Sequence, residues 1–483
     1  MQNNGCILML AIYRDLFTKL NASNVVFCNW KSHHQVNTIL AGEGDLDLFV
    51  PMINQDNFHR IANEFGFKQV QSYQAHHEFI EHYYGLDPTT LKFAHLHVHF
   101  KIVTGEHASK NYLLPIDQYV IDNIDGSNIL PTITNAGRRN IFLIRHFLKI
   151  GSLYGLLQYW KELPKYSKEW SSFDHSIDYE SVDSLSLTST ELSRLGKSYS
   201  ESSIIKQFLS SMQFKFKLRN YRRRGWFAYF IFIHTNFLIR LLNKFFLKKG
   251  KLFSPGIVIA VCGLDGSGKS SLVSSLNKNL GKHFSIKRLH LGRPASSKLT
   301  FLLNPLIKSY SLVIRIFKKG SKSLQHHGIK KISIIYAIRS VLLAYDRRLQ
   351  AIRAHNLSQR GYLVICDRYP GLEVGKMDSP RIITDSKRGY LYQFCWKLEQ
   401  NFYNSIKPAQ ILFNLSVPLE TAIQRNNSRQ KFGKETNDEL RERFLINSGA
   451  DFLAEYKYVI DATQSFDSVF SEVLNKFWFS KTW

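Results

Sequence analysis

The chain has 483 residues, which is too long for one ordinary domain, so we expect two or three domains. Hydrophobic residues make up 44% of the chain, enough for buried cores, and the formal net charge of +26 attracts polyanions such as phosphates, nucleic acid or an anionic membrane. The five cysteines show no CxxC pair and no histidines at ligand spacing, which argues against a disulfide framework or a zinc site and fits a reducing cytoplasm.

The N-terminal residues, MQNNGCILMLAIY, contain no basic residue ahead of their short apolar run. The sequence therefore predicts no signal peptide, and we expect a cytoplasmic protein. The positive charge is concentrated between residues 202 and 345, where Asp265 is the only acidic residue. Such a field favours peripheral contact with the anionic inner face of a membrane, and nucleic acid is the alternative partner.

Residues 1–160 are predicted to form an α+β domain. The stretches 24–30, 45–50 and 95–103 are apolar or alternating and suit strands of a mixed sheet. Residues 139–160 have helical spacing and are predicted to close this domain.

Residues 161–254 are predicted to be a linker followed by a basic, aromatic helical region. The stretch 165–203 is rich in Ser, Asp and Tyr, which is typical of a linker. The apolar run Trp226–Ile233 is shorter than the roughly 20 residues that cross a bilayer. It suits a helix lying in a membrane surface, with Arg222–Arg224 and Lys248–Lys249 near lipid phosphates, or equally a helix buried between two domains.

Residues 255–483 alternate strand-like and helix-like segments, as in a parallel sheet covered on both faces. This predicts an α/β domain with a five-stranded parallel sheet. The expected strands are 256–263, 285–292, 361–367, 409–417 and 457–462.

The segment GIVIAVCGLDGSGKSSLVSSL contains the pattern G-x-x-x-x-G-K-[ST] between an expected strand and an expected helix. Its glycines let successive backbone N–H groups turn toward phosphate oxygens, and the helix adds the positive end of its dipole. Lys269 is predicted to reach the β- and γ-phosphates of ATP, and the Ser270 hydroxyl to bind Mg²⁺. The predicted nucleotide-binding residues of this loop are Gly263, Asp265, Gly266, Ser267, Gly268, Lys269, Ser270 and Ser271.

Four motifs make residues 255–480 resemble the thymidylate kinases, a family of P-loop nucleoside monophosphate kinases. They are the loop GLDGSGKSS, the "ADR"-like helix LLAYDRRLQAIRAHNLSQRG (342–361), the "DRY"-like strand end VICDRYPG (364–371), and the run LEQNFYNSIKPAQILFNLSVPLETAIQR (398–425), which leads into a basic lid-like segment. The resemblance implies a P-loop kinase fold and, since such kinases are commonly dimers, a homodimer.

The resemblance also implies roles for individual residues, and electrostatic reasoning agrees with them. Phosphoryl transfer requires negative charge to be neutralised and two substrates to be held in line. Arg368 would bind the acceptor phosphate through its planar guanidinium, with Arg293 as a second candidate. Asp367, at a strand end, would hold Mg²⁺ or orient the acceptor, while Asp265 would contact an acceptor hydroxyl.

Further arginines follow from the same resemblance. Arg347, in the "ADR"-like helix, would belong to the substrate site. Arg425 and Arg429 would close over the transferring phosphoryl group from the lid, Arg425 on the nucleotide and Arg429 as a catalytic residue.

The chain departs from the family where thymine is read. After the "DRY"-like motif it continues PGLEVGKMDSPRI (370–382) instead of the family's Ser and Ala-Tyr-Gln-Gly run. Leu343 stands where the family often has a Phe that stacks on the base. The phosphate-handling residues are therefore kept while the base-reading residues are missing, which favours an acceptor other than thymidylate.

The stretch AGEGDLDLFV contains Asp45 and Asp47, which a strand places on one face. It resembles the metal-binding D-h-D pair of the nucleotidyltransferase superfamily, which implies an N-terminal α+β nucleotidyltransferase-like domain and a Mg²⁺ site at these two residues. Lys31-Ser32 stands where the superfamily has Gly-Ser, and His97 and His99 lie on the strand expected to supply a third acid. Neutral histidines are poor Mg²⁺ ligands, so altered or lost activity is one interpretation.

Three functions follow from these patterns. The first is an ATP-dependent kinase, of dTMP by family default, or of a glycan or lipid-linked intermediate in bacterial envelope polysaccharide synthesis. The second is a switch in which ATP controls docking to a membrane or nucleic acid. The third is a bifunctional protein with an active nucleotidyltransferase.

Overall fold

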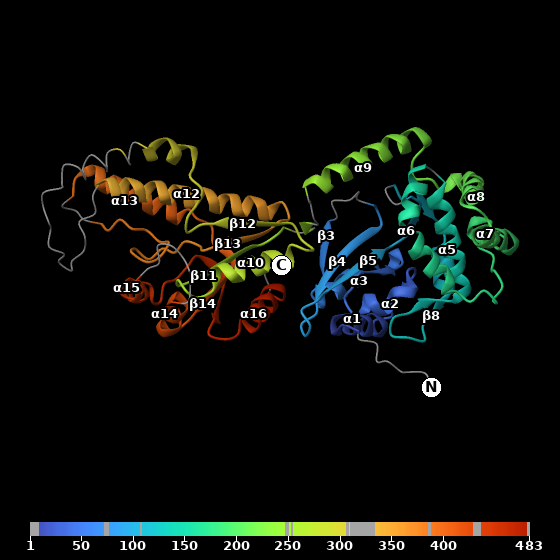
Figure 1. Cartoon of the computed structure of the whole chain (residues 1–483), viewed down its shortest axis with the longest axis horizontal. Coiled ribbons are helices and arrows are strands. Elements are labelled where there is room, and N and C mark those ends of the chain that lie inside the picture. Colours follow the sequence, from blue (N-terminus) through green and yellow to red (C-terminus); the bar gives the residue numbers. More distant parts are fainter. Residues whose placement is uncertain are drawn as a thin grey trace. The chain divides into compact units, whose positions relative to one another are not determined.

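The computed structural model describes residues 9–71, 77–106, 109–151, 153–246, 251–252, 255–305, 309, 334–384, 388–427 and 436–480. The chain divides into two compact units, Met1–Phe253 and Ser254–Trp483, and each has its own sheet (Figure 1).

The N-terminal unit is built on a mixed sheet of eight strands within the described residues. The strand order is β10-β3-β4-β5-β2-β1-β9-β8, and a separate hairpin joins β6 to β7. At the centre, β2 runs parallel to β5, whereas β5 runs antiparallel to β4. The strands are β1 (Cys28–Asn29), β2 (Asp45–Phe49), β3 (Lys68–Gln71), β4 (Ile80–Leu86), β5 (Phe93–His99), β6 (Ile102–Thr104), β7 (Tyr112–Leu114), β8 (Ile124–Asp125), β9 (Thr132–Ile133) and β10 (Lys251–Leu252).

Helices of this unit cover the sheet and form a helical layer beside it. The apolar face of α1 (Ala11–Ala22) packs with α3 (Gln55–Glu64) in one core, and α5 (Asn135–Ile150) is buried along almost its whole length in the other. The remaining helices are α2 (Val36–Leu40), α4 (Asp117–Asp122), α6 (Leu153–Ser171), α7 (Ser189–Glu201), α8 (Ile204–Lys217) and α9 (Trp226–Phe246), with short 3₁₀ turns at His33–Gln35, Met52–Asn54, Asp183–Leu185 and Arg219–Tyr221.

Two parts of this unit differ from the sequence prediction. The helix expected over 139–160 is instead two helices, because α5 ends at Ile150 and α6 begins at Leu153. Gly151 lies between them, and a Cβ added there would lie 2.4 Å from the Ser211 hydroxyl of α8. The expected linker 165–203 is structured at both ends, since residues 165–171 complete α6 and the Thr188 capping box starts α7. Between these helices, Leu185 and Leu187 are buried in the core. Residues 161–253 therefore belong to the N-terminal unit instead of forming a separate region.

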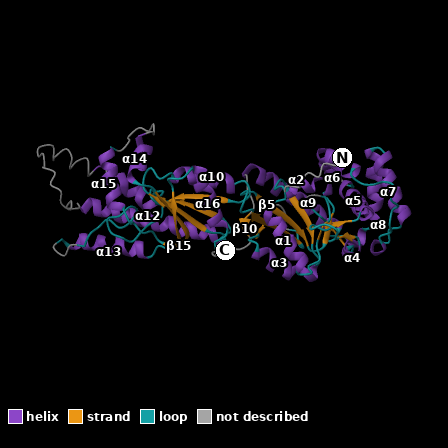
Figure 2. Cartoon of the chain, turned by 90° about the horizontal axis from the view of Figure 1, so that it is seen from below, coloured by secondary structure: helices purple, strands orange, loops and turns teal. Residues whose placement is uncertain are grey.

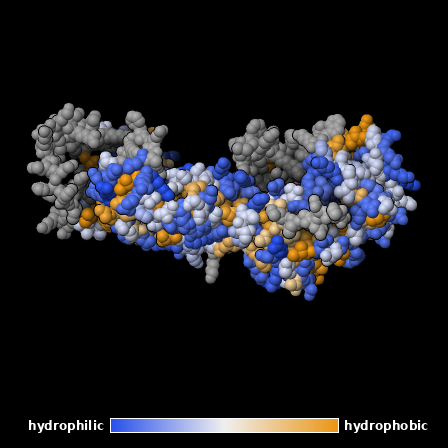
Figure 3. Space-filling model, turned by 60° about the horizontal axis from the view of Figure 1, so that its bottom comes forward, coloured by the Kyte–Doolittle hydropathy of each residue, from blue (hydrophilic) through white to orange (hydrophobic). Residues whose placement is uncertain are grey.

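The basic, aromatic segment forms α9, whose first turns are attached to the N-terminal unit. The Tyr229 hydroxyl donates to Glu106, and the guanidinium of Arg224 lies 3.7 Å from the Phe232 ring. Trp226 and Phe227 of α9 are 75% and 70% exposed. On the face of the molecule shown in Figure 3, the hydrophobic patches are small and lie within a mainly hydrophilic surface. Among the described helices, none has an apolar window long enough to cross a bilayer.

The C-terminal unit contains the expected five-stranded parallel sheet, in the order β12-β13-β11-β14-β15. Each predicted strand segment overlaps one observed strand. The strands are β11 (Val258–Gly263), β12 (Ile286–His290), β13 (Leu363–Asp367), β14 (Ala409–Ser416) and β15 (Ala454–Asp461).

Helices cover both faces of this sheet, as the uninterrupted burial of β11 and β13 requires. In Figures 1 and 2, α12 and α13 lie on one face, and α10 and α16 lie on the other. The helices are α10 (Lys269–Leu280), α12 (Ile334–Gln359), α13 (Tyr390–Asn404), α14 (Leu419–Asn427), α15 (Asn437–Asn447) and α16 (Phe466–Trp478), with a further helical stretch at 298–305.

The strand order determines where a site can form. The chain passes from β11 to the edge strand β12, returns through β13 beside β11, and then continues on the other side with β14 and β15. The connections from β11 and β13 therefore leave the same edge of the sheet and separate from each other. In open α/β sheets, ligands bind in the crevice at such a point.

Candidate active site

The predicted phosphate-binding loop joins β11 to α10 at this crevice. The backbone φ angles of Gly263, Gly266 and Gly268 are +136°, +90° and +91°, values that residues with a Cβ atom rarely adopt. A Cβ on Gly263 would also lie 2.5 Å from the carbonyl oxygen of Leu415 on β14. The loop therefore requires glycine both for its backbone turn and for its close approach to the neighbouring strand.

The loop has free groups of the kind that hold phosphate. Gly268 caps α10 in a left-handed conformation without a side-chain cap, so that the first N–H groups of the helix face outward. The hydroxyl of buried Ser267 has no hydrogen-bond partner among the described residues. These groups fit a bound phosphate chain.

Lys269 lies over the loop. Its ammonium donates to the Leu264 carbonyl at 2.6 Å and lies 3.6 Å from the Asp265 carboxylate. Burial, followed by the charge of Arg368, lowers the pKa of Lys269 to about 8. An incoming phosphate would offer this ammonium a stronger partner than the carbonyl that it now contacts.

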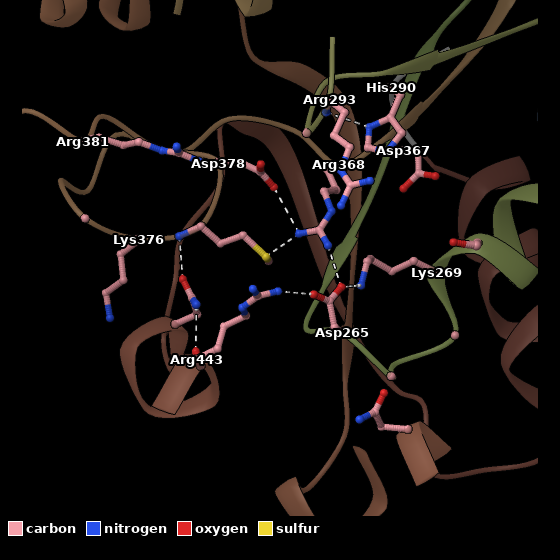
Figure 4. A pocket seen from close by; sticks show the side chains of 18 of the residues that line it. Asp265, Lys269, His290, Arg293, Asp367, Arg368, Lys376, Asp378, Arg381 and Arg443 are labelled. Atoms are coloured by element: carbon pink, nitrogen blue, oxygen red, sulfur yellow. Dashed lines mark hydrogen bonds and ion pairs between the residues drawn. The ribbon is translucent and has the colours of Figure 1, made fainter. Parts of the chain in front are cut away.

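A cavity of about 760 Å³ opens beside the loop (Figure 4). Residues from the loop, from the ends of β12 and β13, and from α15 line it, so it lies where the strand order predicts a site. Its lining contains six lysines and arginines against three aspartates, which suits a ligand with several negative charges. The lining residues are Asp265, Gly266, Gly268, Lys269, Ser270, His290, Gly292, Arg293, Tyr336, Asp367, Arg368, Gly375, Lys376, Met377, Asp378, Arg381, Asn426, Arg443 and Asn447.

Arg368 lies between two carboxylates at the centre of this cavity, as Figure 4 shows. Its guanidinium donates to Asp265 at 2.6 Å and to Asp378 at 3.3 Å. Asp265 also accepts from Arg443 of α15 at 2.8 Å. Burial by itself raises the pKa of Asp265, but the surrounding cations, Lys269 first, lower that pKa below its ordinary value. The carboxylate is therefore charged and holds the two arginines beside the loop.

Arg347, predicted to contact substrate, does not line the cavity. It is completely buried, and its guanidinium donates to the Leu291 carbonyl at 3.1 Å and to Asp378 at 2.7 Å. Because Asp378 in turn contacts Arg368, Arg347 supports the site from behind instead of touching a ligand. A place for Arg347 in the substrate site stays a prediction, and in the structure this residue holds Asp378 from behind the cavity.

The predicted Mg²⁺ ligands Ser270 and Asp367 both line the cavity and offer oxygen donors, the kind that this ion prefers. Asp367 is buried and accepts from Arg288 at 3.1 Å. Arg293 also lines the cavity, where its backbone N–H donates to the His290 ring. The oxygen set fits a magnesium ion.

The other predicted residues of this unit that the structure describes do not line this cavity. Gly263 borders a smaller neighbouring cavity, and Ser271 is exposed on α10. Arg425 donates to the Ala462 carbonyl at 2.8 Å. Arg429 and the lid-like residues around it lie outside the described residues.

Several lining residues were not predicted from the sequence, among them Asp378, Lys376, Arg381 and Arg443. The first three belong to the stretch 370–382, which departs from the thymidylate kinase pattern. Their charges were the available signal, since a loop after a central parallel strand lies at the crevice. Arg443 follows Asp265 by 178 positions, and no local pattern connects the two.

The predicted acidic pair of the N-terminal unit lies on β2. Asp47 is buried, whereas the Asp45 side chain is 62% exposed. Register pairs Asp45 with His95 and Asp47 with His97, and each histidine Nδ1 contacts its aspartate, at 2.5 and 2.8 Å. The neighbouring strand therefore supplies histidines where a third acid was expected, and the Mg²⁺ assignment at Asp45 and Asp47 stays a prediction.

Several known proteins are similar in sequence to part of this chain. The uncharacterized ATP-binding protein YghR of Escherichia coli K12 is 28% identical over 177 residues, which cover 36% of this chain and 69% of YghR. The uncharacterized ATP-binding protein YghS of the same strain is 27% identical over 186 residues, covering 37% and 76%. The thymidylate kinase of Blochmanniella pennsylvanica is 26% identical over 216 residues, covering 44% and 90%.

Among solved structures, deoxyadenosine kinase from M. mycoides with bound dATP matches 46% of this chain and 98% of its own, at 22% identity and a TM-score of 0.24. No protein-family model matches the chain. The loop geometry and the sequence relatives together support a P-loop, nucleotide-kinase-like domain in the C-terminal unit.

Proposed function

We propose that the C-terminal unit binds ATP with Mg²⁺ and transfers the γ-phosphoryl group to a phosphate-bearing acceptor. The observation that carries this proposal is the contact between Arg368 and Asp265, which joins the phosphate-binding loop to a group of cations across one cavity. A protein that only binds ATP needs the loop, whereas a kinase also needs charged groups for a second anion.

In the proposed reaction, an acceptor oxygen attacks the γ-phosphorus of ATP, the bond to the β–γ bridging oxygen breaks, and ADP leaves. Lys269 and the N–H groups of the loop hold the β- and γ-phosphates. Arg368 leaves Asp265 in part and binds the acceptor, so both substrates are held in line and their charge is neutralised. Ser270 and Asp367 would hold Mg²⁺, which neutralises charge on the phosphates.

The acceptor side favours a phosphate over a base as the recognised group. Tyr336 is the only Phe, Tyr or Trp side chain among the described residues that line the cavity, whereas Arg293, Arg381 and Arg443 add positive charge there. Thymidylate is the default acceptor from the sequence relative, and the lining favours as second candidate a phosphorylated glycan or lipid-linked intermediate of envelope polysaccharide synthesis.

The test is an assay with γ-³²P-labelled ATP, dTMP, other nucleoside monophosphates and extracted lipid-linked glycans. We expect acceptor-dependent transfer at ordinary kinase rates, roughly 1–100 s⁻¹. Lys269→Ala should reduce transfer by about 10²–10³-fold, whereas Lys278→Ala, exposed on the same helix, should leave it unchanged. The absence of ATP binding, or ATP turnover independent of every acceptor with equal rates in both variants, would overturn the proposal.

A further inference from the structure

The N-terminal unit places three side chains with metal-binding atoms around one point. Asp47 on β2 and His97 and His99 on β5 each offer one donor atom, and these atoms lie within 4.8 Å of one another. His97 Nδ1 lies 2.8 Å and His99 Nε2 lies 3.9 Å from Asp47 Oδ1. The parallel register of the two strands produces this arrangement, because it sets Asp47 directly opposite His97.

The histidines retain unused hydrogen-bonding atoms inside the protein. His99 is completely buried, and neither of its ring nitrogens has a hydrogen-bond partner among the described residues. The Nε2 atom of His97 is buried and unpartnered in the same way. A metal ion that binds one ring nitrogen of His99 would give this buried side chain a partner that the protein itself does not supply.

The site is reachable from outside. Asp47 and His97 line a cavity of about 360 Å³, together with Lys31. The Lys31 ammonium lies 2.8 Å from Asp47 Oδ1, so one positive charge already lies at the point where a cation would bind.

We propose that Asp47, His97 and His99 bind one divalent transition metal ion of the Zn²⁺ class. Two imidazoles and one carboxylate suit Zn²⁺, whereas Mg²⁺ prefers an all-oxygen set. Three protein ligands leave one position free, and the cavity provides room there for water or an anionic ligand. The cysteine spacing that argued against a zinc site does not apply, because this site contains no cysteine.

This proposal concerns the N-terminal unit, which does not contain the phosphate-binding loop. Its test is therefore independent of the proposed kinase activity. The test uses the full-length protein after removal of metals with a chelator. Titration with Zn²⁺, read by calorimetry and by elemental analysis after desalting, should give one equivalent bound. Titration with Co²⁺ should give the visible absorption of a low-symmetry nitrogen–oxygen site, and millimolar Mg²⁺ should not displace either ion.

Variants assign the site to these three residues. The double change His97→Ala and His99→Ala should weaken Zn²⁺ binding by about 100-fold or more, since even supporting residues change metal affinity by about 10–100-fold. His59→Ala is the matched control, because His59 pairs with Glu81 at 3.0 Å in the same unit and lies outside the trio. Lys31→Met should strengthen binding by about tenfold, since it removes the competing ammonium.

Should the double variant fail to fold by circular dichroism, the isosteric Asp47→Asn takes its place and should weaken binding by at least tenfold. Equal Zn²⁺ affinity in the wild type and in the folded trio variants would overturn the proposal. Complete displacement of Zn²⁺ by Mg²⁺ would do so too, because it would indicate an all-oxygen site.

Discussion

Arg368 donates to Asp265 at 2.6 Å and so connects the residue after β13 to the phosphate-binding loop that follows β11. Arg368 adopts a left-handed backbone conformation with φ of +67°, which is uncommon for a residue with a side chain. Outliers of this kind concentrate at functional sites, where surrounding contacts compensate their cost. The buried carboxylate of Asp378 supplies such a contact on the other side of the guanidinium.

Replacement of Asp265 by Asn should lower kcat/KM for the acceptor by about 10²-fold, because both Arg368 and Arg443 lose the charge that positions them. The measurement is steady-state kinetics at saturating ATP. Asp438→Asn is the control, since Asp438 is 92% exposed and pairs only weakly with Arg441. Equal loss in the two variants would contradict a specific role for Asp265.

Arg347→Met should destabilise the C-terminal unit by roughly 3 kcal/mol, because it leaves the buried carboxylate of Asp378 without its closest cation. Urea denaturation measures this change. The neighbouring Arg348 donates to the exposed Ser405 hydroxyl and has no further hydrogen bond within the described part of the chain, so Arg348→Met should change stability by less than about 0.5 kcal/mol. An unchanged free energy of unfolding in Arg347→Met would indicate that the buried network carries no net stabilisation.

ATP affinity should depend on pH through Lys269, whose pKa burial lowers to about 8. Below that pH the ammonium is charged and attracts the phosphates; above it the free protein must take up a proton on binding. The association constant should therefore be flat near pH 7 and fall by up to tenfold per pH unit above pH 8. Calorimetry of the wild type and of Lys269→Arg, whose guanidinium stays charged, measures this. Parallel profiles in the two proteins would refute the assignment.

Gly263→Ala should abolish ATP binding, since the new methyl group would lie 2.5 Å from the Leu415 carbonyl oxygen at a φ of +136°. Backbone strain alone should cost about 1–3 kcal/mol. Gly126→Ala serves as the control, because no atom lies within 4 Å of the Cβ that it would add. Retained ATP binding in Gly263→Ala would show that the loop is not held against β14 as the structure has it.

Much of the C-terminal unit could be predicted because its signals are local. The apolar strand, the glycines and Lys269 lie within one short segment, so the loop and the start of α10 follow from the sequence pattern alone. The five strands follow similarly from short buried runs that alternate with helical spacing. The expected linker before α7 was different, because its few apolar residues are buried only when α5 and α8 are present.

The sequence by itself determined the phosphate-binding loop and the strands of the parallel sheet, since each depends on residues close together in the chain. The tertiary structure alone decided which charges meet: Arg443 with Asp265, Arg347 with Asp378, and Asp47 with two histidines. Strand register and helix packing set those pairs across 31 to 178 positions of chain, and no periodicity extends over such separations.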